Sequence, residues 1–288
     1  MSAIDRAISE STGSPFQLHT SASIAGGCIN ETFCIEGKDG RQFFVKKNQA
    51  SFLSFFKAEA QALTEIRETQ TIHAPEVIAH GVENDKAFLV LEFMEEGTAS
   101  PSGQAKLGTL LAKMHRVEQA HFGWGMDNCI GATPQPNPKS KNWAEFYRDH
   151  RLSHQFNLAA QKGRRFEGAN DLLDQIDSFF STYHPHPSLL HGDLWGGNAS
   201  YDAAGMPFIF DPASYYGDRE TDLAFTYMFG GFNSNFYQAY EKEYPLNSGF
   251  KVRKTLYNLY HELNHFNLFG GGYSSSAQSS INVLLKQA

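Results

Sequence analysis

Residues 191–198 read His-Gly-Asp-Leu-Trp-Gly-Gly-Asn, and this stretch decides the fold. Asp193 stands five positions before Asn198. Phosphoryl transfer to an alcohol uses an aspartate that accepts the hydroxyl proton and an asparagine five positions later that binds Mg²⁺. Glycine, asparagine and aspartate also favour plain turns, which is the alternative for an isolated Gly-Asp pair. We therefore predict a catalytic loop with Asp193 as the proton acceptor and Asn198 as a magnesium ligand.

A second carboxylate follows the short apolar run 208–210. Asp211 comes directly after this predicted strand, which ends beside the loop. A hard carboxylate there suits a magnesium ion that bridges to a triphosphate. Two neighbouring carboxylates repel each other, and a divalent cation between them removes the repulsion. Asp211 is therefore the second predicted magnesium ligand.

A lysine and a glutamate in the first quarter of the chain supply the positive charge that phosphates need. Lys46 follows the strand-like run 43–45, and Lys47 points to the opposite face of that strand. Glu59 lies on an apolar helical stripe that starts at Phe52. A carboxylate on such a face needs a cationic partner, so we predict a Lys46–Glu59 ion pair. A position at the solvated margin of the stripe is the alternative for Glu59.

Two weaker patterns complete the predicted nucleotide site. Gly26 and Gly27 stand about twenty residues before Lys46, where backbone N–H groups can cover phosphates, although a glycine pair is more often a turn. The adjacent Cys28 is either a small filler or a thiol whose oxidation impairs nucleotide binding. Glu92-Phe93-Met94 ends the apolar run 87–93, and we predict that this connector contacts adenine; an ordinary strand end is the alternative.

Composition limits the class of protein. The chain has 288 residues, 41% of them hydrophobic, and 24 are Phe, which is ample for a packed core. A formal charge of −7 argues against a dedicated nucleic-acid partner. Three cysteines are too few for a zinc site or a disulfide framework, and we find neither a signal peptide nor a long apolar run. We expect a cytoplasmic protein with no membrane or nucleic-acid partner.

The element pattern predicts an α+β fold with two lobes. Residues 1–95 are β-rich with one strong helix and form the predicted nucleotide-binding lobe, an antiparallel sheet with one helix. Residues 96–288 are mainly helical and form the predicted catalytic and substrate-binding lobe. Within it we expect helices at 107–117, 143–158, 221–232 and 251–269, a loop at 133–142 and a lone strand at 208–210.

These motifs together resemble the fructosamine kinase (ketosamine-3-kinase) family, a branch of the protein-kinase-like fold near the aminoglycoside phosphotransferases. The resemblance spans about Gly26 to Tyr273. The loop tryptophan, Trp195, distinguishes this family from aminoglycoside kinases. Further matches are 211–218 (Asp-Pro-Ala-Ser-Tyr-Tyr-Gly-Asp), 228–232 (Met-Phe-Gly-Gly-Phe), 264–267 (Asn-His-Phe-Asn), and Trp143, Phe146, Arg151 and Leu152.

The resemblance implies ATP-dependent phosphorylation of the 3-hydroxyl of a ketosamine, free or protein-bound, with Mg²⁺ as cofactor and deglycation as the outcome. It implies that Trp195 is a wall of the substrate pocket, with core packing as the alternative. We group His191 with the substrate residues, as a structural support of the loop rather than a base, and expect Asp222 to brace the loop backbone. A monomer or a redox-dependent dimer is expected.

Two rival functions remain compatible with the residues. One is a kinase of another small alcohol, such as an aminoglycoside or an amino alcohol. The other is a catalytically silent nucleotide-binding module. Neither the sugar of the ketosamine nor the choice between free and protein-bound amines follows from the residues.

Overall fold

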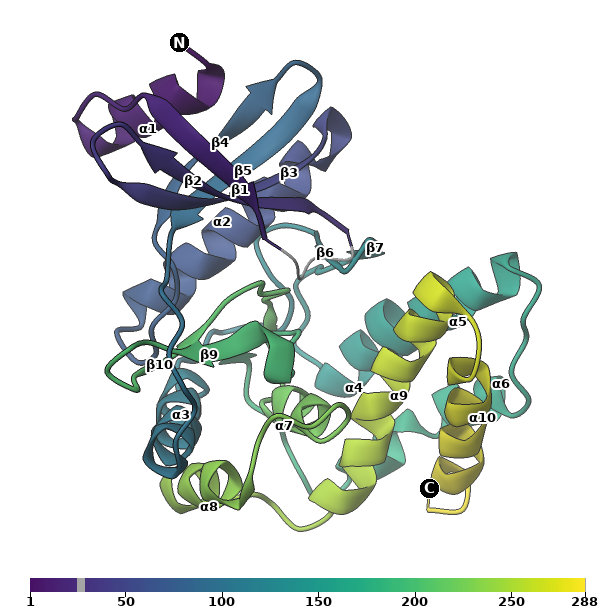
Figure 1. Cartoon of the computed structure of the whole chain (residues 1–288). Helices are drawn as coiled ribbons and strands as arrows, with labels where there is room; N and C mark the ends of the chain where they lie inside the picture. Colours follow the sequence, from purple (N-terminus) through teal and green to yellow (C-terminus); the bar gives the residue numbers. More distant parts are fainter. Residues whose placement is uncertain (25–28, 288) are drawn as a thin grey trace.

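The computed structural model describes residues 1–24 and 29–287, and Figure 1 shows a sheet-containing N-terminal part above a mainly helical C-terminal part. Residues 93–100 connect the two and contain neither helix nor strand. The predicted boundary at Glu95 falls in this segment and stays a proposal. Gly26, Gly27 and Cys28 lie outside the described residues.

A five-stranded antiparallel sheet forms the N-terminal part, in the order β1-β2-β3-β5-β4. The strands are β1 (Leu18–Ser23), β2 (Glu31–Gly37), β3 (Gln42–Gln49), β4 (Val77–Glu83) and β5 (Lys86–Glu92). The sequence predicted β2, β3 and β5. It missed β1 because all six residues of that strand are exposed, so no apolar alternation marks it.

The predicted helix of this part is α2 (Leu53–Glu68), preceded by a 3₁₀ turn at Ala50–Phe52. It packs against β4 and β5 and buries Phe56, Leu63 and Ile66. The predicted stripe therefore faces the sheet, and Glu59 lies on the helix that carries it.

The expectation of a single N-terminal helix is wrong, because α1 (Ala3–Thr12) is a second one. Ser2 begins it with a capping box: the Ser2 hydroxyl accepts from the Asp5 N–H, and the Asp5 carboxylate accepts from the Ser2 N–H. Ile4 and Ile8 are buried against the sheet, beside β4. The capping box was the available sequence signal.

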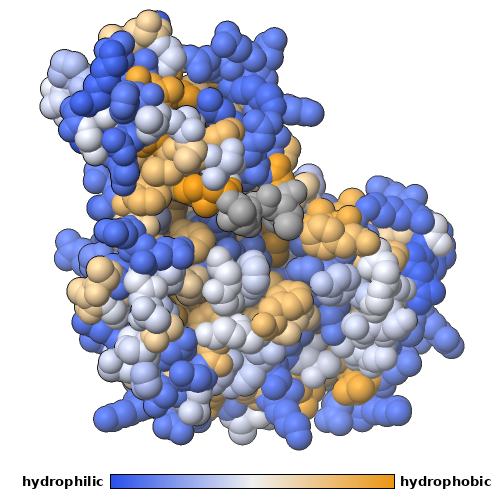
Figure 2. Space-filling model, in the orientation of Figure 1, coloured by the Kyte–Doolittle hydropathy of each residue, from blue (hydrophilic) through white to orange (hydrophobic). Residues whose placement is uncertain are grey.

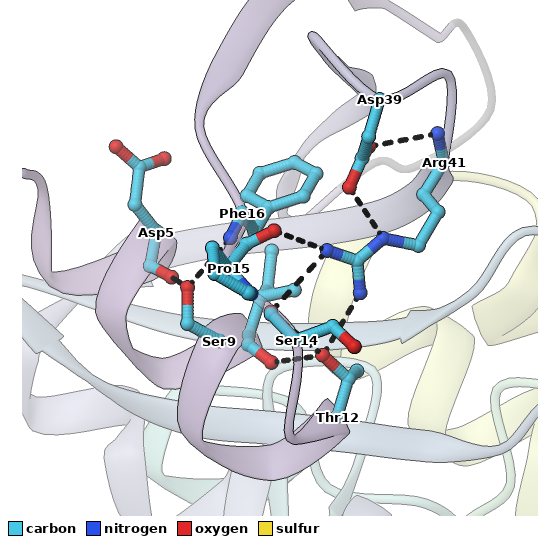
Figure 3. Close-up of polar contacts among 9 residues, drawn as sticks. Asp5, Ser9, Thr12, Ser14, Pro15, Phe16, Asp39 and Arg41 are labelled. Atoms are coloured by element: carbon cyan, nitrogen blue, oxygen red, sulfur yellow. Dashed lines mark hydrogen bonds and ion pairs between the residues drawn. The ribbon is translucent and has the colours of Figure 1, made fainter.

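Arg41, at the start of β3, fastens the end of α1 to the sheet (Figure 3). Its guanidinium donates to the Thr12 hydroxyl at 2.9 Å, to the Pro15 carbonyl at 2.7 Å and to Asp39 at 2.7 Å. It also lies 5.6 Å from the ring centre of Phe16, a buried residue of the N-terminal core. One side chain thus joins the β2–β3 turn to the segment that leaves α1.

The C-terminal part contains eight α-helices among the described residues. They are α3 (Pro101–Met114), α4 (Trp143–Tyr147), α5 (Ser153–Gln161), α6 (Ala169–Asp174), α7 (Glu220–Thr226), α8 (Ser234–Glu243), α9 (Phe250–Phe269) and α10 (Tyr273–Leu284). A π-helical turn (Arg148–Leu152) joins α4 to α5, and 3₁₀ turns occur at Ile176–Phe180 and Gly196–Asn198. In Figure 1 the helices α5, α6, α9 and α10 lie on one side, and α3 and α8 on the other.

Short strand pairs lie between these helices and the sheet. They are β6 (Asn128–Ile130) with β7 (Thr133–Gln135), β8 (Ser188–Leu189) with β11 (Tyr216–Gly217), and β9 (Ala199–Tyr201) with β10 (Pro207–Ile209). The run 208–210 is therefore not a lone strand, and the expected loop 133–142 begins with β7. The helix expected over 221–232 ends at Thr226, and Gly230 and Gly231, with φ of +76° and +93°, follow in a non-helical conformation.

No helix of the described residues is long and apolar enough to cross a bilayer.

We predict that Arg41→Ala lowers the free energy of unfolding by about 1–2 kcal/mol, because charged hydrogen bonds and aromatic contacts are lost at a half-exposed site. Urea unfolding measures the change. Lys38→Ala, in the same turn and exposed, is the matched control and should change stability by less than about 0.5 kcal/mol. Equal effects of the two substitutions would contradict the fastening role of Arg41.

Candidate active site

The centre of the site is the ammonium group of Lys46, on β3. Its Nζ lies 2.6 Å from Glu59 Oε1 and 2.5 Å from Asp211 Oδ1. The Lys46 side chain is 3% exposed, whereas Lys47 points to the other face and lies over the ring of Phe33. The predicted contact between Lys46 and Glu59 is present, and the solvated-margin alternative for Glu59 is excluded by its 13% exposure.

Charge pairing keeps Lys46 protonated. Burial alone disfavours an ammonium ion, but the carboxylates of Asp211 and Glu59 outweigh this effect and raise the pKa of Lys46. The group therefore carries a full positive charge at neutral pH, as a phosphate-binding lysine must.

The predicted catalytic loop lies between β8 and β9. Gly192 has a φ of +82°, and a side chain at this position would collide with the Ala213 carbonyl. The Ala213 N–H donates to the His191 carbonyl at 2.9 Å. Only glycine allows this close approach of the loop to the segment that follows Asp211.

Asp222, on α7, braces the loop as expected. It accepts the backbone N–H groups of His191 at 2.7 Å and Gly192 at 2.8 Å. Its carboxylate also lies 3.1 Å from His115 Nε2, at the end of α3. Burial disfavours the charged form of Asp222. The hydrogen bond and the charge of His115, together with the backbone hydrogen bond from Gly192, outweigh burial and lower the pKa of the Asp222 carboxyl. Asp222 is therefore an ionised support under the loop.

Asp193 and Asn198 are side by side. Asn198 Nδ2 donates to the Asp193 carbonyl at 2.8 Å and lies 3.3 Å from its carboxylate. Burial, reinforced by the charge of Asp211, raises the pKa of Asp193 to about 7, although the hydrogen bond from Asn198 opposes this. Without a bound cation, Asp193 therefore exchanges its proton near neutral pH.

Asp211 has an unusual backbone conformation. Its φ is +57°, in the left-handed region that few residues other than glycine adopt. Such strain is held by the surrounding structure and is frequent at functional sites. The carboxylate remains 43% exposed although it contacts Lys46, so one side of it is open to a ligand.

The donors present suit a magnesium ion. Asn198 and Asp211 offer hard oxygen atoms, and Mg²⁺ is commonly held by one or two carboxylates together with substrate phosphates. Within residues 1–24 and 29–287, no three His, Cys, Asp or Glu side chains gather to hold a metal by themselves. The oxygen atoms of Asn198 and Asp211 therefore fit a cation that takes its remaining ligands from elsewhere.

A cavity of about 390 Å³ opens onto these residues. Figure 2 shows the indentation between the two parts of the molecule, with apolar surface along it. The predicted residues that line the cavity are Lys46, Glu59, Asp193, Trp195, Asn198 and Asp211.

Some predicted residues do not line it. The His191 ring is fully buried, and its Nε2 donates to the Phe210 carbonyl at 2.9 Å, so His191 supports the loop and does not reach the substrate cavity. Grouping His191 with the substrate residues was therefore wrong. Glu92, Phe93 and Met94 also lie outside the cavity wall, and their contact with adenine stays a prediction.

Sequence reasoning missed several lining residues. Asn128 and Cys129 come from β6, and Asn264 and His265 from α9. Burial raises the pKa of the Cys129 thiol to about 12, so it is not a nucleophile. The only sequence signal was the Asn264–Asn267 motif, which the family resemblance had marked without a role.

Glu65 gives α2 a second anchor that the sequence did not reveal. Its carboxylate accepts from Trp124 Nε1 at 3.1 Å and from the Tyr216 hydroxyl at 3.4 Å. Tyr216 belongs to β11, which pairs with β8 directly before the catalytic loop. The helix that carries Glu59 is thus held against the same strands that position Asp193.

The fold and site define a protein-kinase-like phosphotransferase. They combine a lysine–glutamate pair on a sheet and its helix, a loop with Asp and Asn five positions apart, and an Asp two residues after a strand. A sequence model of the fructosamine kinase family matches residues 1–287. The chain belongs to the fructosamine kinase family.

Known proteins of this family are similar to the chain in sequence and in structure. A Synechocystis protein named as a probable ketoamine kinase is 45% identical over 98% of this chain and 96% of its own length. The chloroplastic protein-ribulosamine 3-kinase of Arabidopsis thaliana is 39% identical over 95% of this chain and 85% of its own. A crystal structure from Haemophilus somnus, named as a candidate fructosamine-3-kinase, superposes with a TM-score of 0.92 at 31% identity, covering 98% of this chain and 96% of that one.

We predict that Asp222→Asn lowers the free energy of unfolding by about 2 kcal/mol or more, because an amide NH2 group replaces one carboxylate oxygen and then faces a backbone N–H donor of the loop in a buried site. Thermal unfolding checks the stability, and turnover should fall with it because the loop loses its support. The control is Asp174→Asn, on the exposed side of α6, which should leave both unchanged. A fully stable Asp222→Asn variant would contradict the bracing role.

Proposed function

We propose that this kinase transfers the terminal phosphoryl group of ATP to the 3-hydroxyl of a ketosamine. The observation that carries the proposal is the adjacency of Asp193 and Asn198 in a cavity shared with the Lys46–Glu59–Asp211 cluster. The names of the relatives support the class of acceptor, and the deglycation that follows such phosphorylation is the expected outcome.

Each residue has one task in this mechanism. Asp193 orients the attacking hydroxyl and accepts its proton, a role for which its carboxylate must be ionised. Glu59 holds Lys46 in place, so that its ammonium group can bind phosphate oxygens. Asn198 and Asp211 would hold Mg²⁺, and the bound ion would neutralise the charge of the phosphates. The chain therefore contributes positioning and fixed charge.

Trp195 completes the acceptor site in this proposal. It follows Asp193 by two residues, lines the cavity and keeps 39% of its surface exposed, so it is not a core residue. Sugar C–H faces pack well against an indole ring. An acceptor without a sugar would lack this contact with the indole ring and is therefore disfavoured.

We also propose a cytoplasmic location and no nucleic-acid or membrane partner. A redox-dependent dimer would require an accessible thiol. Burial raises the pKa of the Cys34 and Cys129 thiols, which lowers the fraction of thiolate at neutral pH.

We predict that Asp193→Asn lowers kcat at least about 100-fold, because the hydroxyl loses its proton acceptor. A coupled assay of ADP release, with fructose-lysine or ribulose-lysine as acceptor, measures it. Affinity for ATP should change little, since Lys46 is intact. Asp174→Asn serves again as the control, and near wild-type turnover by a folded Asp193→Asn variant would rule out the assignment.

A substrate panel separates the rival functions. We expect Mg²⁺-dependent ADP release with ketosamines, abolished by EDTA, and little with kanamycin or choline. Strong turnover of kanamycin or choline with none of the ketosamines would identify another alcohol kinase. ATP binding without ADP release on any acceptor would identify a silent nucleotide-binding module.

A further inference from the structure

The cavity has two chemically different halves. In one half the carboxylates of Glu59 and Asp211 contact Lys46, and Asp193 lines the same cavity. The other half is built largely from rings, and we call it the aromatic wall: Trp195, Phe229, His265, Phe269 and Tyr273.

The rings of the aromatic wall form a continuous series. The Trp195 and Phe229 ring centres are 6.1 Å apart, and those of Phe229 and His265 are 5.1 Å apart. His265 in turn lies 5.8 Å from Phe269 and 5.0 Å from Tyr273. The series therefore leads from the catalytic loop, past the end of α7, to the turn between α9 and α10.

Three of these rings keep much of their surface free. Trp195 is 39% exposed, Phe229 42% and Phe269 59%. The neighbouring Phe225 also lines the cavity but is only 1% exposed, and its ring stacks on His261 at 3.6 Å. Large exposed apolar surface that is continuous with a catalytic cavity marks a binding surface.

Phosphoryl transfer does not need this surface. The acceptor hydroxyl must lie at Asp193, and one ring at Trp195 suffices for the sugar. A ketosamine, however, carries a second part, the substituent on its amine nitrogen, which must extend away from Asp193. Figure 2 shows apolar surface along the indentation through which it would pass.

We infer that the aromatic wall beyond Trp195 is a subsite for this amine substituent, and that it selects substituents with an alkyl chain or an aromatic ring. The inference rests on the proposed function and names the class of acceptor for the same site. The alkyl stem of a glycated lysine belongs to this class.

The wall also tolerates the charge of the substrate amine. A ketosamine nitrogen is cationic at neutral pH, and aromatic faces attract cations. Burial lowers the pKa of the His265 imidazole, so this ring is neutral near pH 7 and does not repel the amine. Apolar contact supplies the selectivity, and the aromatic faces accommodate the charge.

The test uses three ketosamines that share one sugar and differ only in the amine: ethanolamine, hexylamine and benzylamine. For the wild-type chain we expect KM values for the hexyl and benzyl compounds about tenfold below that for the ethanolamine compound, as expected from burial of a few carbon atoms. Phe269→Ala should raise KM for these two about three- to tenfold. It should leave kcat, and KM for the ethanolamine compound, within about twofold.

A control variant and a second variant of the aromatic wall complete this test. Tyr227→Ala removes an equally exposed ring, 42%, outside the cavity, and should change none of the constants. Phe229→Ala should also raise KM for the hexyl and benzyl compounds, and a melting curve checks that both variants fold. Equal KM values for the three compounds, or equal losses for all three in Phe269→Ala, would overturn the subsite and leave the proposed function intact. No ADP release from any of them would overturn the proposed function and the subsite with it.

Discussion

The site depends on one buried ammonium group. Lys46 Nζ contacts Glu59 from α2 and Asp211 from the segment after β10, so it joins the sheet, the helix packed on it and the catalytic half of the cavity. An unpaired ammonium at 3% exposure would cost several kcal/mol, which is why both carboxylates must stay in place. The interaction therefore holds together segments that lie up to 165 residues apart.

The catalytic loop receives its support from α7, whose first three side chains are polar although the helix is buried. Asp222 accepts two loop N–H groups. Two residues earlier, Glu220 pairs with Arg253 of α9 through two hydrogen bonds, of 2.7 and 3.0 Å, at 0% exposure. Because removal of either partner would leave a buried charge, α7 is fixed to α9, and Asp222 is held where the loop requires it. Asp222 thereby positions the backbone of the loop that carries Asp193.

The cavity separates charge from apolar surface. On the side of Lys46, buried carboxylates shift pKa values and suit phosphate and metal chemistry. On the side of α9 and α10, partly exposed rings suit the organic part of an acceptor. Glu65 of α2 links the two parts of the chain through Trp124 and Tyr216, next to the strand that leads into the loop. In the proposed mechanism, the nucleotide side and the acceptor side meet at Asp193.

The amino-acid sequence by itself determined the features that depend on local spacing. Asp193 and Asn198 lie in one loop, strand alternation places Lys46 and Lys47 on opposite faces, and Glu59 lies on the apolar stripe of α2. Only the tertiary structure decided which distant groups meet. His115 and Asp222 are 107 residues apart, and Trp124 lies 59 residues from Glu65, so no periodicity could pair them. The exposed strand β1 and the full burial of His191 were equally hidden, because accessibility arises from packing between elements and not from the order of residues within one.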